Sequence, residues 1–192
     1  MLSLVFHAFY ILHFEGTENI PERGGVIYAS NHRSMADPVL ITIPVKKRFC
    51  YMAKEELFKN PLFAALIKAL GAFPVVRGSG STDVIDESVK RLEMGRNLGI
   101  FPEGTRSKDG KLGRCKSGIV LIAAQTGADI IPVGISFEGK LHFRSRITVR
   151  YGKPIPAQEL RLSAEKPSIK EIRAVKNRIM SELAQLVVQP NE

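Results

Sequence analysis

The sequence predicts a single α/β domain with a mixed, largely parallel central sheet flanked by helices. Strand and helix signals alternate along the chain, which is the pattern of α/β folds. The 192 residues contain no repeat, low-complexity tract or long linker, and one domain commonly has about 100–200 residues. A composition of 44% hydrophobic and 24% charged residues is that of a globular protein. We therefore treat residues 1–192 as one domain.

Six short apolar runs between turn residues are expected to be strands. Gly24-Gly25 forms the turn before the first run, and Pro102 ends a later one. In the last run apolar and arginine side chains alternate, as on a strand with one buried face. The six runs are residues 26–29, 48–53, 73–76, 98–101, 130–136 and 143–151.

Capping residues place the helices. Asp37 and Asn60 each precede a proline, which favours the first helical position. The helix after Asn60 is expected to run to residue 70 and to end at Gly71. Three further helices are expected over residues 83–95, over residues 116–126 and after a capping box at Ser168 and Glu171. We expect the last of these helices to serve packing only.

The first 14 residues, MLSLVFHAFYILHF, are expected to form an apolar N-terminal helix. The run is shorter than the roughly 20 residues that span a bilayer, and it lacks the basic leader and cleavage site of a signal peptide. A core helix or an interfacial helix fits better, and we favour the interfacial one. The helix over residues 61–70 is apolar nearly all round, which suits deep burial or a nonpolar partner. Both segments are candidates for lipid contact, and both equally fit ordinary core packing.

The charge and the cysteines narrow the function classes. A net charge of +9 favours polyanionic partners, among them nucleic acid, anionic lipid, phosphorylated substrates and acidic carrier proteins. Two cysteines form no disulfide framework and suit a reducing compartment. No nucleotide-binding glycine motif and no zinc-ligand spacing is present. The arginine-bearing run at residues 143–151 lacks interleaved aromatic residues and any nucleic-acid-binding signature, so we expect no nucleic-acid partner.

The first loop that carries chemistry joins a buried strand to a helix and contains His32 and Asp37. Such strand ends are preferred sites for catalytic groups in open α/β sheets. An imidazole titrates near neutrality and is able to remove a proton from a hydroxyl. If the loop folds back, the carboxylate five residues on is able to hold one ring N–H and stabilise the imidazolium. The alternatives are a polar surface histidine and a plain helix cap at Asp37.

The second loop, residues 101–107, gathers a carboxylate, a glycine, two hydroxyls and a guanidinium. Arg106 is suited to binding phosphate through its planar fork. Gly104 allows the backbone to approach a ligand closely, and backbone amides there are able to face a developing oxyanion. The alternative is a surface turn followed by the polar run 108–111.

Together these loops resemble the glycerolipid acyltransferase family, which includes 1-acylglycerol-3-phosphate acyltransferases. The family pattern has four ordered blocks, and the chain matches it from residue 31 to residue 133. Block three, Phe-Pro-Glu-Gly-Thr-Arg-Ser, is matched at every position of residues 101–107, whereas blocks two and four are weak patterns. The other matching residues are Asn31, His32, Ser34 and Asp37 in block one, Gly71, Phe73 and Arg77 in block two, and Ile131, Pro132 and Val133 in block four.

The resemblance implies a glycerol-3-phosphate acyltransferase-like fold and a role for each matching residue. His32 is expected to be the general base and Asp37 its partner. Residues expected to bind substrate, with the arginines on the acceptor's phosphate and a minor phosphate role for the lysine, are Asn31, Arg77, Glu103, Gly104, Thr105, Arg106 and Lys116. Residues expected to shape the acyl or acceptor site are Phe73, Phe101 and Pro132.

The resemblance also implies a reaction. The chain is expected to transfer an acyl group from acyl-CoA or acyl carrier protein to the sn-2 hydroxyl of 1-acyl-sn-glycerol 3-phosphate (lysophosphatidate), giving phosphatidic acid. Neither a cofactor nor a metal is expected. Glycerol 3-phosphate, another lysophospholipid or a lyso-ornithine lipid stays open as the acceptor. The expected location is the cytoplasmic face of the cell membrane, on an anionic surface, as a peripheral or monotopic protein. Many family members carry a longer hydrophobic N-terminal segment, so the depth of membrane insertion stays open.

Overall fold

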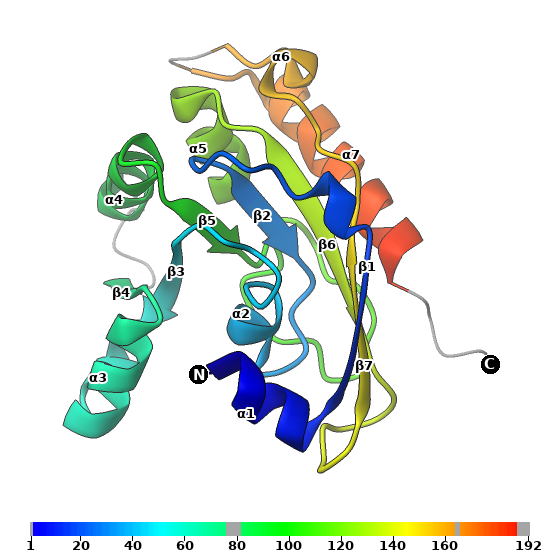
Figure 1. Cartoon of the computed structure of the whole chain (residues 1–192). Helices are drawn as coiled ribbons and strands as arrows, with labels where there is room; N and C mark the ends of the chain where they lie inside the picture. Colours follow the sequence, from blue (N-terminus) through cyan, green and yellow to red (C-terminus); the bar gives the residue numbers. More distant parts are fainter. Residues whose placement is uncertain (1, 76–81, 164–165, 188–192) are drawn as a thin grey trace.

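A computed structural model describes residues 2–75, 82–163 and 166–187 of the chain (Figure 1). Within these residues one seven-stranded sheet forms the centre of the molecule. Its strands are β1 (Ile11–Glu15), β2 (Ile27–Ser30), β3 (Phe49–Lys54), β4 (Ala72–Val75), β5 (Asn97–Ile100), β6 (Ile130–Ser136) and β7 (Arg146–Tyr151).

The strand order in the sheet is β1-β7-β6-β2-β5-β3-β4. All neighbouring strands run parallel except β6 and β7, which are antiparallel. The prediction of a mixed, largely parallel sheet is therefore confirmed. Five of the six predicted strands agree with the structure to within a residue, but β7 starts three residues later than expected. Arg144 has a left-handed φ of 63°, and the Ser145 amide donates to the carbonyl of His142, so a turn occupies these positions.

Helices cover both faces of the sheet. On one face α4, α5 and α7 contribute side chains to a core that contains Leu92, Ile119 and Ile179. On the other face Phe6 of α1 and Leu40 of α2 pack against a second core. The helices are α1 (Leu2–Phe9), α2 (Asp37–Leu40), α3 (Pro61–Ala69), α4 (Thr82–Glu93), α5 (Gly118–Thr126), α6 (Ala157–Leu160) and α7 (Ile169–Leu186), with short 3-10 turns η1 (Thr17–Asn19) and η2 (Glu55–Phe58).

The capping predictions are confirmed at two helices. The Asn60 side chain accepts a hydrogen bond from the amide of Phe63 at the start of α3. Ser168 and Glu171 form the predicted reciprocal capping box at the start of α7. Among the described residues, no helix is both long enough and apolar enough to cross a membrane.

The predicted N-terminal helix over residues 1–14 is wrong in its second half. The helix α1 ends at Phe9, and residues 11–15 form the edge strand β1, which pairs in parallel with β7. Leu12 and Phe14 point to the second core while the exposed His13 lies between them, a two-residue period that is easily missed in so apolar a run. An ion pair between Glu15 and the Arg150 guanidinium, with 2.7 Å between Oε2 and Nε, fastens the end of this strand.

Candidate active site

Both sequence motifs emerge at the same edge of the sheet. The strands β2 and β5 are parallel neighbours, with Ala29 in register with Ile100. The loop with His32 leaves the carboxyl end of β2, and the loop with Glu103 leaves the carboxyl end of β5. The Ser107 amide donates to the carbonyl of His32 at 2.7 Å, so the two loops are in direct contact.

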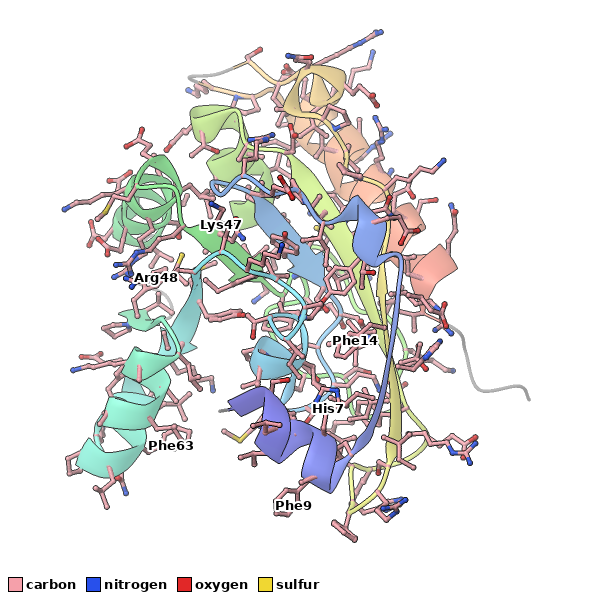
Figure 2. All side chains as sticks on the ribbon, viewed as in Figure 1. His7, Phe9, Phe14, Lys47, Arg48 and Phe63 are labelled. Carbon is pink, nitrogen blue, oxygen red and sulfur yellow. The ribbon has the colours of Figure 1, made fainter. Side chains whose placement is uncertain are left out.

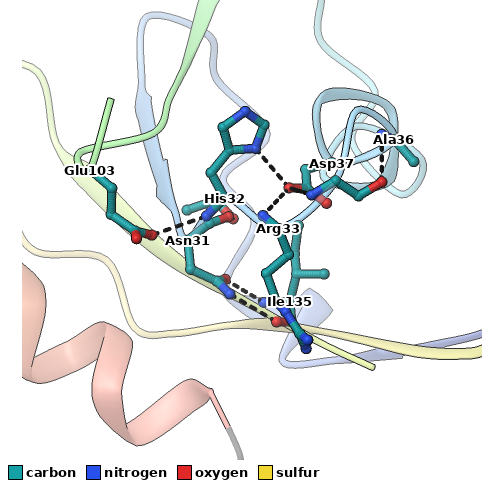
Figure 3. Close-up of polar contacts among 9 residues, drawn as sticks. Asn31, His32, Arg33, Ala36, Asp37, Glu103 and Ile135 are labelled. Carbon is teal, nitrogen blue, oxygen red and sulfur yellow. Dashed lines mark hydrogen bonds and ion pairs between the residues drawn. The ribbon is translucent and has the colours of Figure 1, made fainter. Parts of the chain in front are cut away.

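His32 and Asp37 form a hydrogen-bonded pair (Figure 3). The distance from His32 Nδ1 to Asp37 Oδ2 is 2.8 Å. The same oxygen accepts from the amides of Arg33 at 2.6 Å and Ser34 at 2.7 Å, and the carboxylate is fully buried. Asp37 is the first residue of α2 and the N-cap is Ala36, so the predicted capping role for Asp37 is wrong. Its carboxylate instead organises the loop that precedes it.

This contact fixes the tautomer of His32. A carboxylate only accepts hydrogen bonds, so Nδ1 must carry the proton that is shared with Asp37. In the neutral ring Nε2 then has a free lone pair, which is the form that a general base requires. The His32 side chain is 19% exposed. Its ring stacks on Phe101 with centroids 4.1 Å apart and planes 19° apart, so Phe101 lies directly against the candidate base.

Glu103 connects the two loops through hydrogen bonds to their backbone. Oε1 accepts from the His32 amide at 3.1 Å, and Oε2 accepts from the Gly113 amide at 2.9 Å. The residue is only 7% exposed. Both carboxylate oxygens thus accept hydrogen bonds from backbone amides. This positioning role was not predicted from the sequence. Predicting this role would require knowing that the side chain of Glu103 contacts the backbone of His32, 71 residues away.

Asn31 fastens the first loop to the sheet. Its amide nitrogen donates to the carbonyl of Ile135 at 2.9 Å, and its amide oxygen accepts from the Ile135 N–H at 2.7 Å. The residue is 2% exposed. Its side chain was expected to bind substrate, and the contact that the structure gives it is this bond with β6.

A cavity of about 710 Å³ opens beside the second loop. Glu103, Thr105 and Arg106 contribute to its wall, whereas His32 is not part of the lining. The two sites are adjacent because Glu103 contacts the His32 amide with one oxygen and a residue of the cavity wall with the other. The cationic side chains in the wall are those of Arg106, Lys111, Arg114, Lys116 and Lys176.

Gly104 and Lys116 lie in contact within the second loop. Gly104 has a left-handed φ of 70°, and its amide donates to the Phe101 carbonyl at 2.9 Å. A Cβ at this position would lie 2.8 Å from Nζ of Lys116 and would displace the flexible end of that side chain, and the positive φ itself favours glycine. The Lys116 amide donates to the Pro102 carbonyl, which closes the loop.

Two other expected site residues are not brought to His32. Phe73 is buried in the core beneath the guanidinium of Arg91, which lies 4.5 Å from its ring centroid. Pro132 lies within β6, where its carbonyl accepts from the Gly152 amide. Arg77 lies outside the described residues.

Two residues near the site, Arg33 and Lys176, were not predicted from the sequence to belong to it. The Arg33 guanidinium lies 4.0 Å above the Phe137 ring and donates to the Phe137 carbonyl at 2.5 Å, and burial lowers its pKa. Lys176 comes from α7, a helix predicted to serve packing only. The apolar periodicity of α7 predicts which of its side chains are buried. It does not predict which loop lies beside the polar side chains of the helix. Among the described residues, no group of three histidine, cysteine, aspartate or glutamate side chains is arranged to hold a metal.

Comparison with known proteins identifies a family. The model of the Acyltransferase family matches residues 11–136. The chain is 32% identical to the 1-acyl-sn-glycerol-3-phosphate acyltransferase of Streptococcus pneumoniae over 181 residues, which cover 91% of this chain and 65% of that protein. It is also 32% identical to the chloroplastic enzyme LPAT1 of Arabidopsis thaliana over 72% of this chain. The matched part is 40% of LPAT1 and 41% of the chloroplastic relative BAT2 of Brassica napus, so the chain corresponds to less than half of these two relatives.

A solved structure has the same fold. The crystal structure of the 1-acyl-sn-glycerophosphate (LPA) acyltransferase PlsC from Thermotoga maritima superposes with a TM-score of 0.69 and 26% sequence identity. The similarity covers 95% of this chain and 75% of that one. The sheet with its flanking helices is therefore shared with a solved acyltransferase.

Proposed function

Because this chain belongs to the acyltransferase family, we propose that it transfers an acyl group from a thioester to the sn-2 hydroxyl of 1-acyl-sn-glycerol 3-phosphate, giving phosphatidic acid. The observation that carries the proposal is the His32–Asp37 pair, in which a buried carboxylate fixes the base tautomer of an imidazole. The relatives named above support lysophosphatidate as the acceptor.

In the proposed reaction His32 Nε2 takes the proton of the acceptor hydroxyl. The oxygen attacks the thioester carbonyl, and a tetrahedral intermediate forms with its charge on the former carbonyl oxygen. Collapse of the intermediate breaks the carbon–sulfur bond and leaves the new ester. The thiolate then recovers the proton from the imidazolium. Asp37 stabilises the imidazolium through the Nδ1 hydrogen bond, and the stacked ring of Phe101 adds a favourable interaction with the positive charge.

Backbone amides of the second loop are proposed to stabilise the oxyanion. The Gly104 amide is already bonded to the Phe101 carbonyl, which removes it from this role. The amides of Thr105 and Arg106 donate to no described residue and therefore are the proposed donors. A single donor of this kind typically contributes about 10²–10³ in kcat.

Arg106 and Lys116 are proposed to bind the acceptor's phosphate. Both line the cavity next to Glu103, and both are exposed to solvent. An arginine fork matches phosphate oxygens, and a lysine adds a point charge. Arg77 is proposed for the same phosphate on the strength of the family pattern alone.

Direct attack is favoured over a covalent acyl-enzyme. Burial raises the pKa of Cys50 and of Cys115 to about 11, so neither thiol is an accessible thiolate near neutral pH. Ser34 gives its hydroxyl oxygen as acceptor to the Ala36 amide within the loop. A mechanism that needs only the base fits these side chains.

The test is replacement of His32 by alanine, assayed with lysophosphatidate and an acyl-CoA. We expect a loss of at least about 10²-fold in kcat, the lower range for a positioned base. His13→Ala is the control, because His13 is 68% exposed on the edge strand β1. A His32→Ala enzyme that retained most of the wild-type rate would refute the proposed base.

The proposal extends to docking on an anionic membrane surface at the cytoplasmic face. Phe9 at the end of α1 is 53% exposed and packs edge-on against Phe143, which is 64% exposed. Leu62 of α3 is 84% exposed. The helices α1 and α3 lie at the same end of the molecule, with Phe9 and Phe63 labelled in Figure 2. Apolar side chains combined with a net charge of +9 suit an anionic bilayer surface.

Vesicle binding tests this extension with point substitutions. Deletion of residues 1–14 would remove β1 and its pairing with β7, so it would damage the sheet itself. The double change Leu4→Ser and Phe9→Ser is expected to weaken sedimentation with phosphatidylglycerol vesicles. The control is Ile169→Ser, an 87% exposed residue at the start of α7. In Figure 1 the helix α7 begins at the opposite end of the molecule from α1. Equal loss in both variants would contradict a defined lipid-facing end.

A further inference from the structure

The cavity beside the second loop holds more positive charge than one phosphate group requires. Its cations come from two parts of the chain, the loop after β5 and the helix α7. They number five against the two carboxylates of Glu103 and Asp109, which leaves an excess of three positive charges. The cations are Arg106, Lys111, Arg114, Lys116 and Lys176.

The two carboxylates are already engaged by other groups. Glu103 accepts from the amides of His32 and Gly113. Asp109 accepts from the Lys111 amide at 3.2 Å and from the Ser107 hydroxyl at 3.0 Å, and these bonds lower its pKa. None of the five cations forms an ion pair within 4.0 Å with a described residue. The cavity therefore presents its cations to whatever enters it.

The size of the cavity suits a small molecule. At about 710 Å³ it lies within the range of roughly 300–1,000 Å³ that is typical of small-molecule pockets. A docked carrier protein would instead cover a broad surface, about 800 Å² on each partner. The volume also far exceeds that of one phosphate monoester, so there is room for a second, larger anion.

Lys176 is the one cation among the five that comes from the helix α7 and not from the loop after β5. It is half-buried on α7, directly after the buried Val175, and its charge acts on the buried Cys115 thiol. Its ammonium group forms no ion pair with a described residue, so it is available to a bound anion.

We propose that Lys111, Arg114 and Lys176 bind the nucleotide phosphates of a coenzyme A thioester donor, while Arg106 and Lys116 take the acceptor's phosphate. This inference rests on the proposed acyl transfer. The phosphates of such a donor lie far from its thioester along the pantetheine arm. Their subsite should therefore lie away from the base, within the reach of that arm. The cavity meets this condition, since His32 is not in its lining whereas Glu103, in its wall, bonds to the His32 amide.

The kinetic test compares donors with and without phosphates. Lys176→Gln is expected to raise the KM for acyl-CoA about 3- to 10-fold, the loss of one charged contact. The kcat, the KM for lysophosphatidate and the KM for an acyl N-acetylcysteamine thioester, which has no phosphate, should not change. Lys170→Gln is the control, because Lys170 is exposed on the same helix and outside the cavity.

Three results would overturn the assignment. An unchanged acyl-CoA KM would remove Lys176 from donor binding. A rise only in the KM for lysophosphatidate would assign Lys176 to the acceptor's phosphate. A rise only with acyl carrier protein as donor would mean that this face docks a protein.

A binding measurement separates this inference from the proposed reaction. Calorimetric titration of the full chain with free coenzyme A needs no acceptor. We expect the wild type and Lys170→Gln to bind alike and Lys176→Gln to bind about 3- to 10-fold more weakly. This pattern would support the donor subsite even if lysophosphatidate proved not to be the acceptor. No binding by the wild type, or equal binding by all three proteins, would refute it.

Discussion

Replacing Asp37 by asparagine tests how the buried carboxylate supports His32. In the wild type one oxygen, Oδ2, accepts from the His32 ring and from the amides of Arg33 and Ser34. The other oxygen, Oδ1, is buried and has no hydrogen-bond partner among the described residues. Asparagine is nearly the same size, so the loop is able to keep its shape. Its amide oxygen would take the Oδ2 position, and its NH₂ group would take the Oδ1 position.

Two costs follow from this exchange. A buried NH₂ group without an acceptor destabilises the fold by about 1–3 kcal/mol. The imidazolium that forms during reaction also loses its negative partner, and a hydrogen bond to a charged group contributes about 1.5–3 kcal/mol. At 1.36 kcal/mol per factor of ten, kcat should fall about 10- to 150-fold. Because the charge matters only once the imidazole is protonated, kcat and kcat/KM should fall together while KM stays the same.

The assay is steady-state acylation of lysophosphatidate with acyl-CoA, accompanied by thermal unfolding to show that the variant is folded at the assay temperature. Asp86→Asn is the matched control, since Asp86 is exposed on α4. If Asp37→Asn retained more than half of the wild-type kcat, the carboxylate would not be stabilising a charged imidazole. If only KM rose, Asp37 would act through substrate binding, and the proposed pair would be refuted.

Three further predictions concern the framework of the site. In Glu103→Gln one of the two backbone amides now bound by Glu103 would face an NH₂ donor, so the free energy of unfolding in urea should fall by about 1–3 kcal/mol. Glu138→Gln, at an exposed position, is the control and should show no such fall. Gly134→Ala would place a Cβ 2.6 Å from the Leu186 Cβ, which should lower the free energy of unfolding by about 1–3 kcal/mol and lower the Tm. An unchanged Tm would mean that α7 moves away from β6 at little energetic cost. The capping hydrogen bonds from Ser168 lower the pKa of Glu171 from 4.5 to about 2, so this carboxylate stabilises the fold above pH 4.5 and the effect is lost as the pH falls toward 2. The Tm difference between wild type and Glu171→Gln, which removes the titrating carboxylate, should therefore shrink between pH 7 and pH 3, and a constant difference would contradict the coupling.

The sequence predicted the fold class and most elements because local signals agreed with the tertiary structure. The strand β6 has the bounds that its apolar run predicts, and α7 begins at its capping box. The strand β1 was missed because its alternation covers only five residues within a longer apolar run. Pairing with β7, more than 130 residues away, decides its conformation, and no local pattern carries that information.

The candidate site divides in the same way. The His32–Asp37 contact joins residues five positions apart, so the local spacing together with the family resemblance suggested it. The bonds of Glu103 to His32 and of Asn31 to Ile135 join segments 71 and 104 residues apart. Sequence assigned both side chains to substrate, because it shows which residue types are present but not which backbone groups lie within their reach.

The way these carboxylates are satisfied explains how the site keeps its positive charge. Buried acids are often neutralised by arginine or lysine, which would consume the cations that a phosphorylated substrate needs. Here Asp37 accepts from two backbone amides and an imidazole, and Glu103 accepts from two backbone amides. Amides stabilise a carboxylate without a mobile counter-charge. Arg106 and the neighbouring lysines consequently stay unpaired among the described residues at the cavity wall, so one loop pair both positions His32 and leaves a cationic surface beside it.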